Sequence, residues 1–139
     1  MTVRRRRDRG SATIEAVILA PAFLLFIGLI IGAGRVATAH QSVESAAAEA
    51  ARTASISRTA GQARADATSS AQHTLANQGI QCASLTVDVD TSGFSTPVGT
   101  PARVTATVVC VGDLSVPGMP GTIRIAATVG SPLDTYRGR

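Results

Sequence analysis

The chain has 139 residues, which allows one small domain with an appendage and excludes multidomain enzymes. Aromatic residues make up only 3% and tryptophan is absent, so a core must be built from Ala, Val, Ile and Leu. Thirteen basic residues, all of them Arg, stand against nine acidic ones and give a net charge of +4. As a bulk figure, this charge suggests an anionic partner such as nucleic acid or phospholipid.

The position of the charge decides between these partners. Five Arg and one Asp lie in the first nine residues and carry +4, whereas residues 10–139 hold eight Arg and eight acids, which balance. A nucleic-acid-binding domain spreads basic side chains over a folded face and often adds stacking aromatics. Here the basic block directly precedes an apolar segment. We therefore expect a membrane partner and no nucleic acid.

The apolar segment, residues 16–34, has nineteen residues without a charge, enough for a helix of about 28 Å that spans a bilayer core. Eleven of them are Val, Ile, Leu or Phe, and these favour insertion by about 3–7 kcal/mol. The basic block on one side, with Arg35 alone on the other, predicts a cytoplasmic N-terminus. The sequence thus predicts a leader at residues 1–10, a transmembrane helix at 11–34 and an extracytoplasmic remainder.

A cleaved secretory signal is the alternative for this segment. Ala37-Thr38-Ala39 has the small-residue pattern that signal peptidase prefers. The apolar run is longer than the roughly 7–15 residues of a signal peptide, and Glu15 lies at its edge. A secreted binding module released after Ala39 therefore stays open.

Residues 10–15, Gly-Ser-Ala-Thr-Ile-Glu, join the basic block to the apolar helix. A carboxylate at a membrane border usually has a partner. If the chain were cut after Gly10, Ser11 would gain an α-amine that is largely protonated at neutral pH. Ser11 and Glu15 are four residues apart on one helical face, so Glu15 could neutralise its own amine or that of a neighbouring subunit. A solvated Glu15 without a role is the alternative.

Together these features resemble the type IV prepilin pattern: a basic leader, a Gly before the cut, Glu as the fifth residue after it, and an apolar helix. More narrowly, residues 9–52 look like the TadE-like family of pseudopilins in tight-adherence (Flp-type) pilus and secretion systems. The residues that carry this resemblance are Arg9-Gly10-Ser11-Ala12, Ile14-Glu15-Ala16, Pro21, Gly34-Arg35 and the Ala-rich run 41–52.

The resemblance implies that a membrane-embedded prepilin peptidase cuts between Gly10 and Ser11, and that the product is a minor pilin or pilus-assembly factor. Glu15 would pair with a subunit N-terminus during assembly with other pilin-like subunits and the assembly machinery. The protein would be a single-pass protein of the cell membrane and, after processing, part of an extracellular pilus. Ala16 replaces the aromatic residue that many relatives carry, and a permanently anchored accessory protein is a further alternative.

Beyond the membrane the small residues follow a helical period. Two stripes with spacings of three and four residues predict one long helix, straight or kinked, from about Ser11 to Ala76, with an Ala-rich extracytoplasmic part at 35–78. The stripes could pack on the protein's own C-terminal domain or on neighbouring subunits. Within the membrane, Gly28 and Gly32 form a G-x-x-x-G pattern that lets helices approach closely in an oligomer. The stripes comprise Val36, Ala39, Val43, Ala46, Ala50 and Ala54, then Ala60, Ala63, Ala67, Ala71 and Leu75.

Residues 79–139 change to alternating apolar and polar positions, which predicts three half-buried antiparallel strands and an α+β, pilin-like fold. Matching the apolar faces pairs Leu85 with Val108 and places Cys82 opposite Val111. Cys82 is therefore expected in a bend or bulge before the first strand, from which it forms a disulfide with Cys110. A metal or redox pair fits poorly, because the chain has no C-x-x-C and both histidines lie on the predicted helix.

The chain contains no G-x-S-x-G, Walker-type loop or H-E-x-x-H motif. Asp88 and Asp90 share one face of a predicted strand, where two acids are most simply solvated. We therefore expect no enzyme activity, no cofactor and no metal site.

Overall fold

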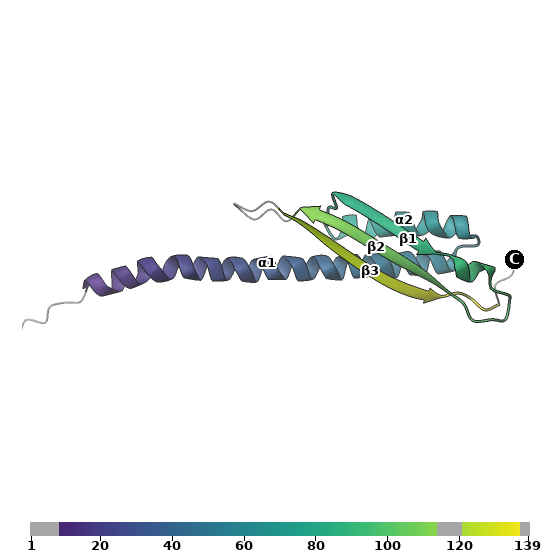
Figure 1. Ribbon diagram of the computed structural model, residues 1–139, viewed down its shortest axis with the longest axis horizontal. Coiled ribbons are helices and arrows are strands. Elements are labelled where there is room, and N and C mark those ends of the chain that lie inside the picture. The colour runs from purple at the N-terminus through teal and green to yellow at the C-terminus, as the bar shows by residue number, and fades with distance from the viewer. Residues whose placement is uncertain (1–8, 114–120, 137–139) are drawn as a thin grey trace, which may run out of the picture. The chain divides into compact units, whose positions relative to one another are not determined.

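The computed structural model describes residues 9–113 and 121–136, with side chains from residue 14 onward, so most of the predicted leader lies outside the described residues. The described elements are α1 (Arg9–Ile56), α2 (Ala60–Asn77), β1 (Ser84–Asp90), the 3-10 helix η1 (Ser92–Ser95), β2 (Arg103–Asp113) and β3 (Thr122–Pro132) (Figure 1). This confirms the predicted α+β fold. The chain divides into an N-terminal unit, Met1–Ala37, and a C-terminal unit, Thr38–Arg139. Helix α1 contributes to both.

The prediction of one helix reaching Ala76 is wrong, because the helix breaks at residues 57–59. Ser57 Oγ donates hydrogen bonds to the Thr53 carbonyl (3.1 Å) and to Asp66 Oδ2 (3.0 Å). Thr59 has extended backbone angles, and its Oγ1 accepts the N–H of Gln62, which makes it the N-cap of α2. Side-chain hydrogen bonds therefore hold a turn that contains neither Gly nor Pro.

Helices α1 and α2 form an antiparallel hairpin within the C-terminal unit. Three side-chain hydrogen bonds join them. From one bond to the next, the residue number on the α1 side rises by as much as the residue number on the α2 side falls. Equal steps mean that the two helices stay side by side over about three turns. The pairs are Gln78 Nε2 to Ser45 Oγ (3.3 Å), Thr53 Oγ1 to Ser70 Oγ (3.3 Å) and Ser57 Oγ to Asp66 Oδ2 (3.0 Å).

The buried side of this hairpin is made mostly of alanine. The predicted stripe is buried from Val43 to Ala54 and continues on α2 from Ala63 to Leu75. It packs with the inner face of the sheet in one core, so the protein's own C-terminal domain covers it. The buried hydrophobic helix residues are Val43, Ala46, Ala47, Ala50, Ala51, Ala54, Ala63, Ala67, Ala71 and Leu75.

The sheet has the order β1-β2-β3, and both pairs are antiparallel (Figure 1). The predicted alternation is confirmed, but the predicted register is wrong by two residues: Leu85 lies opposite Cys110, and Val111 lies opposite Ser84. A slip of two residues keeps every side chain on the same face, so matching apolar faces cannot distinguish the two registers.

Helix α2 ends where the alternating pattern begins. Gly79 has a positive φ of 70°, the Gly79 N–H donates to the Ala76 carbonyl, and the Ile80 N–H donates to the Leu75 carbonyl, both at 3.0 Å. This is a Schellman motif, which Gly favours because it has no Cβ. It turns the chain from α2 toward β1.

Candidate functional site

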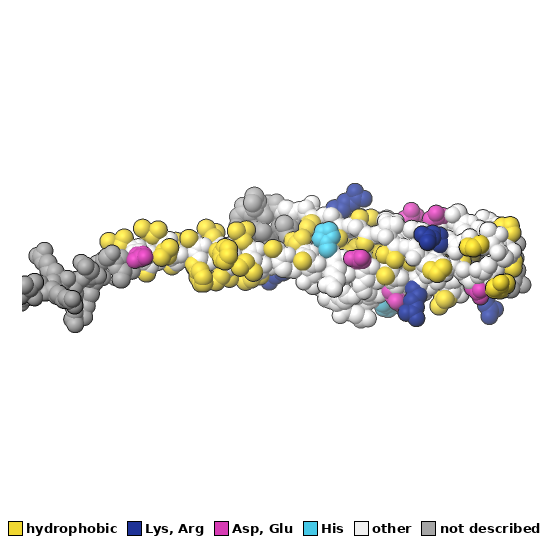
Figure 2. All heavy atoms as spheres, turned by 90° about the horizontal axis from the view of Figure 1, so that it is seen from below, with side chains coloured by type: hydrophobic (Ala, Val, Ile, Leu, Met, Phe, Trp, Pro, Cys, Tyr) yellow, Lys and Arg dark blue, Asp and Glu magenta, His cyan; other side chains and the backbone are white. Residues whose placement is uncertain are grey.

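The N-terminal unit presents an apolar helix whose described side chains are exposed. Every described side chain from residue 14 to residue 35 is exposed, including Leu29 at 72%. Figure 2 shows hydrophobic side chains along this stretch. Among the described residues, α1 is the helix that is long and apolar enough to cross a membrane. A helix that is apolar on all sides is typical of a protein core or of a bilayer, and the described side chains of this stretch are exposed.

Part of this helix surface forms a shallow apolar groove of about 520 Å³. Small side chains form its floor beside larger ones, next to Pro21 in the helix interior. Such a surface offers contact area to another apolar helix or to lipid chains. Its lining residues are Ala16, Leu19, Ala20, Ala22, Phe23 and Phe26.

Glu15 is the one charged side chain between residues 14 and 34, and it is exposed. Gly10 and Ser11 belong to α1, but their side-chain surroundings lie outside the described residues. The structure therefore leaves the cleavage between Gly10 and Ser11, and the partner of Glu15, as predictions.

Gly28 and Gly32 lie in the exposed part of α1. A Cβ added at either position would meet no atom within 4 Å. None of the described residues packs on these glycines, so their role in helix packing stays a prediction.

Cys82 and Cys110 form the predicted disulfide, with their Cα atoms 5.4 Å apart. Cys82 directly precedes a bend at Ala83, as expected, and the Ala83 N–H donates to the Val111 carbonyl at 2.7 Å. The bond ties the segment between α2 and β1 to β2. Because the two cysteines are 28 residues apart, the cross-link contributes about 3–4 kcal/mol by restricting the unfolded chain.

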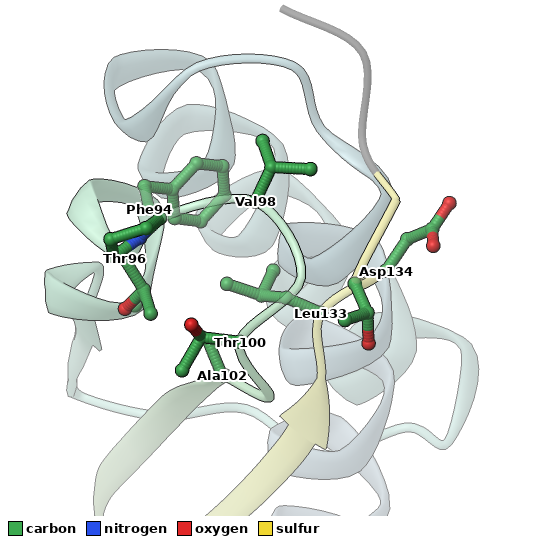
Figure 3. A pocket seen from close by; sticks show the side chains of 10 residues that line it. Phe94, Thr96, Val98, Thr100, Ala102, Leu133 and Asp134 are labelled. Carbon is green, nitrogen blue, oxygen red and sulfur yellow. The ribbon is translucent and has the colours of Figure 1, made fainter.

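The described part of the C-terminal unit contains a small pocket and a larger open groove. The pocket in Figure 3, between the segment after β3 and the loop after β1, has about 40 Å³, far below the roughly 300 Å³ of a small-molecule site. Its labelled side chains include Phe94, Val98 and Leu133. An open groove of about 620 Å³ lies between the α1–α2 turn and residues 132–134. Among the described residues, no three His, Cys, Asp or Glu side chains gather as metal ligands.

Asp90 has a local structural role. The Ser92 N–H donates to Asp90 Oδ1 at 2.9 Å, and this bond, helped by the Ser92 side chain and the charge of Arg64, lowers the pKa of Asp90. Arg64 Nη2 also donates to Thr91 Oγ1 at 2.9 Å. These contacts connect α2 to the turn that follows β1.

Comparison with known sequences identifies one related segment. The family described as TadE-like protein matches residues 10–52. The match confirms the resemblance seen in the sequence, over the part of the chain that contains Gly10, Glu15, the apolar helix and the start of the Ala-rich stripe. Searches of curated proteins and of solved structures found no match. The family comprises structural pilus proteins rather than enzymes, and the match and the apolar helix together fit a membrane-anchored pilin-like protein.

Proposed function

We propose that this protein is a minor pilin or pilus-assembly factor that is processed after Gly10 and assembles through its N-terminal helix. The observation that carries the proposal is the contrast between the two parts of α1. Residues 14–35 are exposed, whereas residues 43–54 contribute to a closed core. The surface left for assembly is therefore the apolar helix, which resides in the membrane before assembly.

Glu15 gives this helix a means of aligning with its neighbours. A carboxylate at the border of a bilayer is costly without a partner. Processing after Gly10 would create a protonated amine on Ser11 at the same border. Pairing of Glu15 with the amine of a neighbouring subunit would neutralise both charges and set the relative depth of the two helices.

The charge distribution and the disulfide support one orientation. The arginines of residues 4–9 favour a cytoplasmic N-terminus. The disulfide between Cys82 and Cys110 suits an oxidising compartment on the other side. The proposed location is a single-pass membrane protein with its C-terminal unit outside, which moves into a pilus after processing.

Release after Ala39 receives less support. Helix α1 continues without a break through residues 37–39, and Ala39 is half-buried against the core. The family match also covers both sides of this site. These observations favour residues 10–52 as one retained segment.

The N-terminal residue of the membrane-bound protein distinguishes the three alternatives. Mass spectrometry of the membrane fraction should find a chain that begins at Ser11. A chain that begins at His40 would establish the secreted module. An intact leader would establish a permanently anchored accessory protein.

Two substitutions test the separate steps. Gly10→Leu should block processing, and an unchanged mature mass would refute the cleavage assignment. Glu15→Ala should be processed but should not enter sedimentable filaments. Glu44→Ala, which removes an exposed carboxylate from the other part of α1, is the matched control and should assemble normally.

A further inference from the structure

Among the described residues no strand pairs with the outer side of β1 or of β3, and these two free edges of the sheet differ in character. β3 has eleven residues, Arg124 is its one charged residue, and Pro132 stands at its end. β1 has seven residues and carries Asp88 and Asp90. Proteins protect sheet edges by keeping them short, charged, or interrupted by Pro. The edge of β3 is long and weakly protected, so it is open to pairing with another strand.

The hydrogen-bond pattern shows which backbone groups face this edge. The Leu133 N–H donates to the Ala102 carbonyl at 2.9 Å, in the same register as the whole β2–β3 ladder. In an antiparallel ladder every second residue bonds to the partner strand. The odd-numbered residues of β3 therefore bond to β2, and the N–H and C=O groups of Arg124, Ala126 and Thr128 point to the free edge.

The side chains agree with this assignment. Thr107 and Thr128 lie opposite each other with their Oγ1 atoms 2.9 Å apart. Close side chains are a property of the pairs that do not exchange backbone hydrogen bonds. By the same alternation across β2, the even-numbered residues of β1 bond to β2, and Leu85, Val87 and Val89 point their backbone groups to the opposite free edge.

The two edge strands also carry apolar side chains on the inner face of the sheet that are only partly buried. The inner-face side chains of the central strand, Val104, Ala106 and Val108, are fully buried. Those of the edges, such as Leu85 on β1 and Ala127 on β3, are only half-buried. A neighbouring sheet in line with this one would cover them.

We propose that β3 of one copy pairs with β1 of a second copy as parallel strands. Both strands are antiparallel to β2 and therefore run in the same direction. A second copy in the same orientation thus extends the sheet with its helices on the same face. In a parallel pair, each residue bonds to the residues before and after its partner. The backbone groups that face the free edge belong to even-numbered residues on β3 and to odd-numbered residues on β1. When even-numbered residues of the two strands lie opposite each other, each of these β3 residues can bond to the two neighbours of its partner.

Charge and orientation favour this pairing over the two symmetric ones. Aligning Ser84–Asp90 with residues 122–128 pairs all of β1 and brings Arg124 diagonally beside Asp88, within reach of a long side chain. Pairing β1 with β1 would gather aspartates. An antiparallel pair of β3 strands would invert one copy and place the two Thr38 ends at opposite sides, and a parallel pair would place the helices of the two copies on opposite faces of the sheet. This last step rests on the proposed anchoring of both copies in one membrane.

Photo-crosslinking of the full-length chain in membranes tests the pairing. Thr128 is replaced by p-benzoylphenylalanine, and the cross-linked dimer is reduced and digested with trypsin. We expect a link from residues 125–137 to residues 65–103, which contain β1. A dimer that links two copies of residues 125–137, or the absence of a dimer, would overturn the proposal. The same label at the exposed Glu49 is the control and should give no link to residues 125–137.

Proline and charge variants make the test specific to the edge. Ala126→Pro removes an N–H that points outward, so it should reduce the dimer at least tenfold while the C-terminal unit stays folded. Ala127→Pro, its neighbour, removes a ladder bond and should unfold the sheet.

Arg124→Asp and Asp88→Arg should each weaken the dimer, and combining them should restore it. A double variant that stays as weak as the single ones would refute the charge pairing. The N-terminal mass, read from the same samples, reports the proposed processing independently.

Discussion

The two parts of α1 show opposite relations between side-chain size and exposure. Large apolar residues cover the first part and are exposed, whereas the second part buries alanines such as Ala46, which is 0% exposed. In the first part, size provides contact area for lipid or another helix. In the second part, small side chains let α2 and the sheet approach the helix backbone. One continuous helix therefore combines an exposed apolar part with a part that packs in a protein core, and its composition changes between the two.

The largest effect should come from charge in the first part. Replacing Leu24 and Leu25 with Asp costs about 6 kcal/mol near the middle of a membrane helix, which is comparable to the whole gain from insertion. The double variant should therefore be extracted from membranes by alkaline carbonate. Ala48→Asp, on the exposed side of the second part, should leave the protein in the membrane pellet. Equal extraction of both variants would remove the contrast between the two parts.

Loss of the disulfide should affect only the C-terminal unit. Replacing Cys82 and Cys110 with Ser should lower its free energy of unfolding by about 3–4 kcal/mol. Denaturant titration of the full chain in detergent measures this change. Carbonate extraction should show unaltered membrane insertion, because both cysteines of the cross-link belong to the C-terminal unit. A parallel loss of insertion would show that the two units depend on each other.

Enlarging a small residue should have opposite consequences in the two parts. Ala50→Leu introduces three extra carbons into a fully buried position and should cost about 1–3 kcal/mol of stability. Ala20→Leu makes the same change in the exposed groove of the first part. Thermal unfolding in detergent should detect the first change and leave the second within error. A destabilised Ala20→Leu chain would indicate that the first part is already packed.

The smallest effect concerns the pH dependence of stability. It arises from Asp90, which lies outside both parts of α1. The Ser92 N–H lowers the pKa of Asp90 below its ordinary value of 3.8, so the ionised carboxylate favours the folded state. This contribution is present above the unfolded pKa and is lost as the pH falls through the lower folded pKa. The melting temperatures of the natural chain and Asp90→Asn should differ slightly at pH 6 and converge below pH 3. If the two melting temperatures still differ at low pH, the effect comes from the shape of the side chain at position 90 and not from its charge.

The sequence predicted the elements with regular periods and missed the features that depend on single hydrogen bonds. The Ala stripe and the strands follow directly from spacing, and the family match supports the N-terminal third. The break between α1 and α2 was missed because residues 57–59 include no Gly or Pro. One signal was available: Thr59 followed by Gln62 has the spacing of a capping box. The strand register was missed because apolar periodicity repeats every two residues.

The candidate site divides in the same way. The apolar helix and the disulfide pair could be read from composition and spacing, and the structure contains both. The roles predicted for Glu15, Gly28 and Gly32 would involve other subunits, so the structure of a single chain does not test them. The apolar groove beside Pro21 was also missed, because its shape arises from Phe23 and Phe26 standing beside alanines on one helical face.

The short turn at residues 57–59 has a consequence for domain swapping. Ser, Arg and Thr can all adopt helical angles, so straightening the turn would join α1 and α2 into one rod and let α2 of one copy pack on α1 of another. The two α1 helices would then run antiparallel, with their Thr38 ends at opposite ends of the swapped dimer. Copies anchored in one membrane cannot adopt that arrangement. The proposed anchor would thus protect the hairpin from exchange, and a fragment that lacks residues 1–37 would lose this protection.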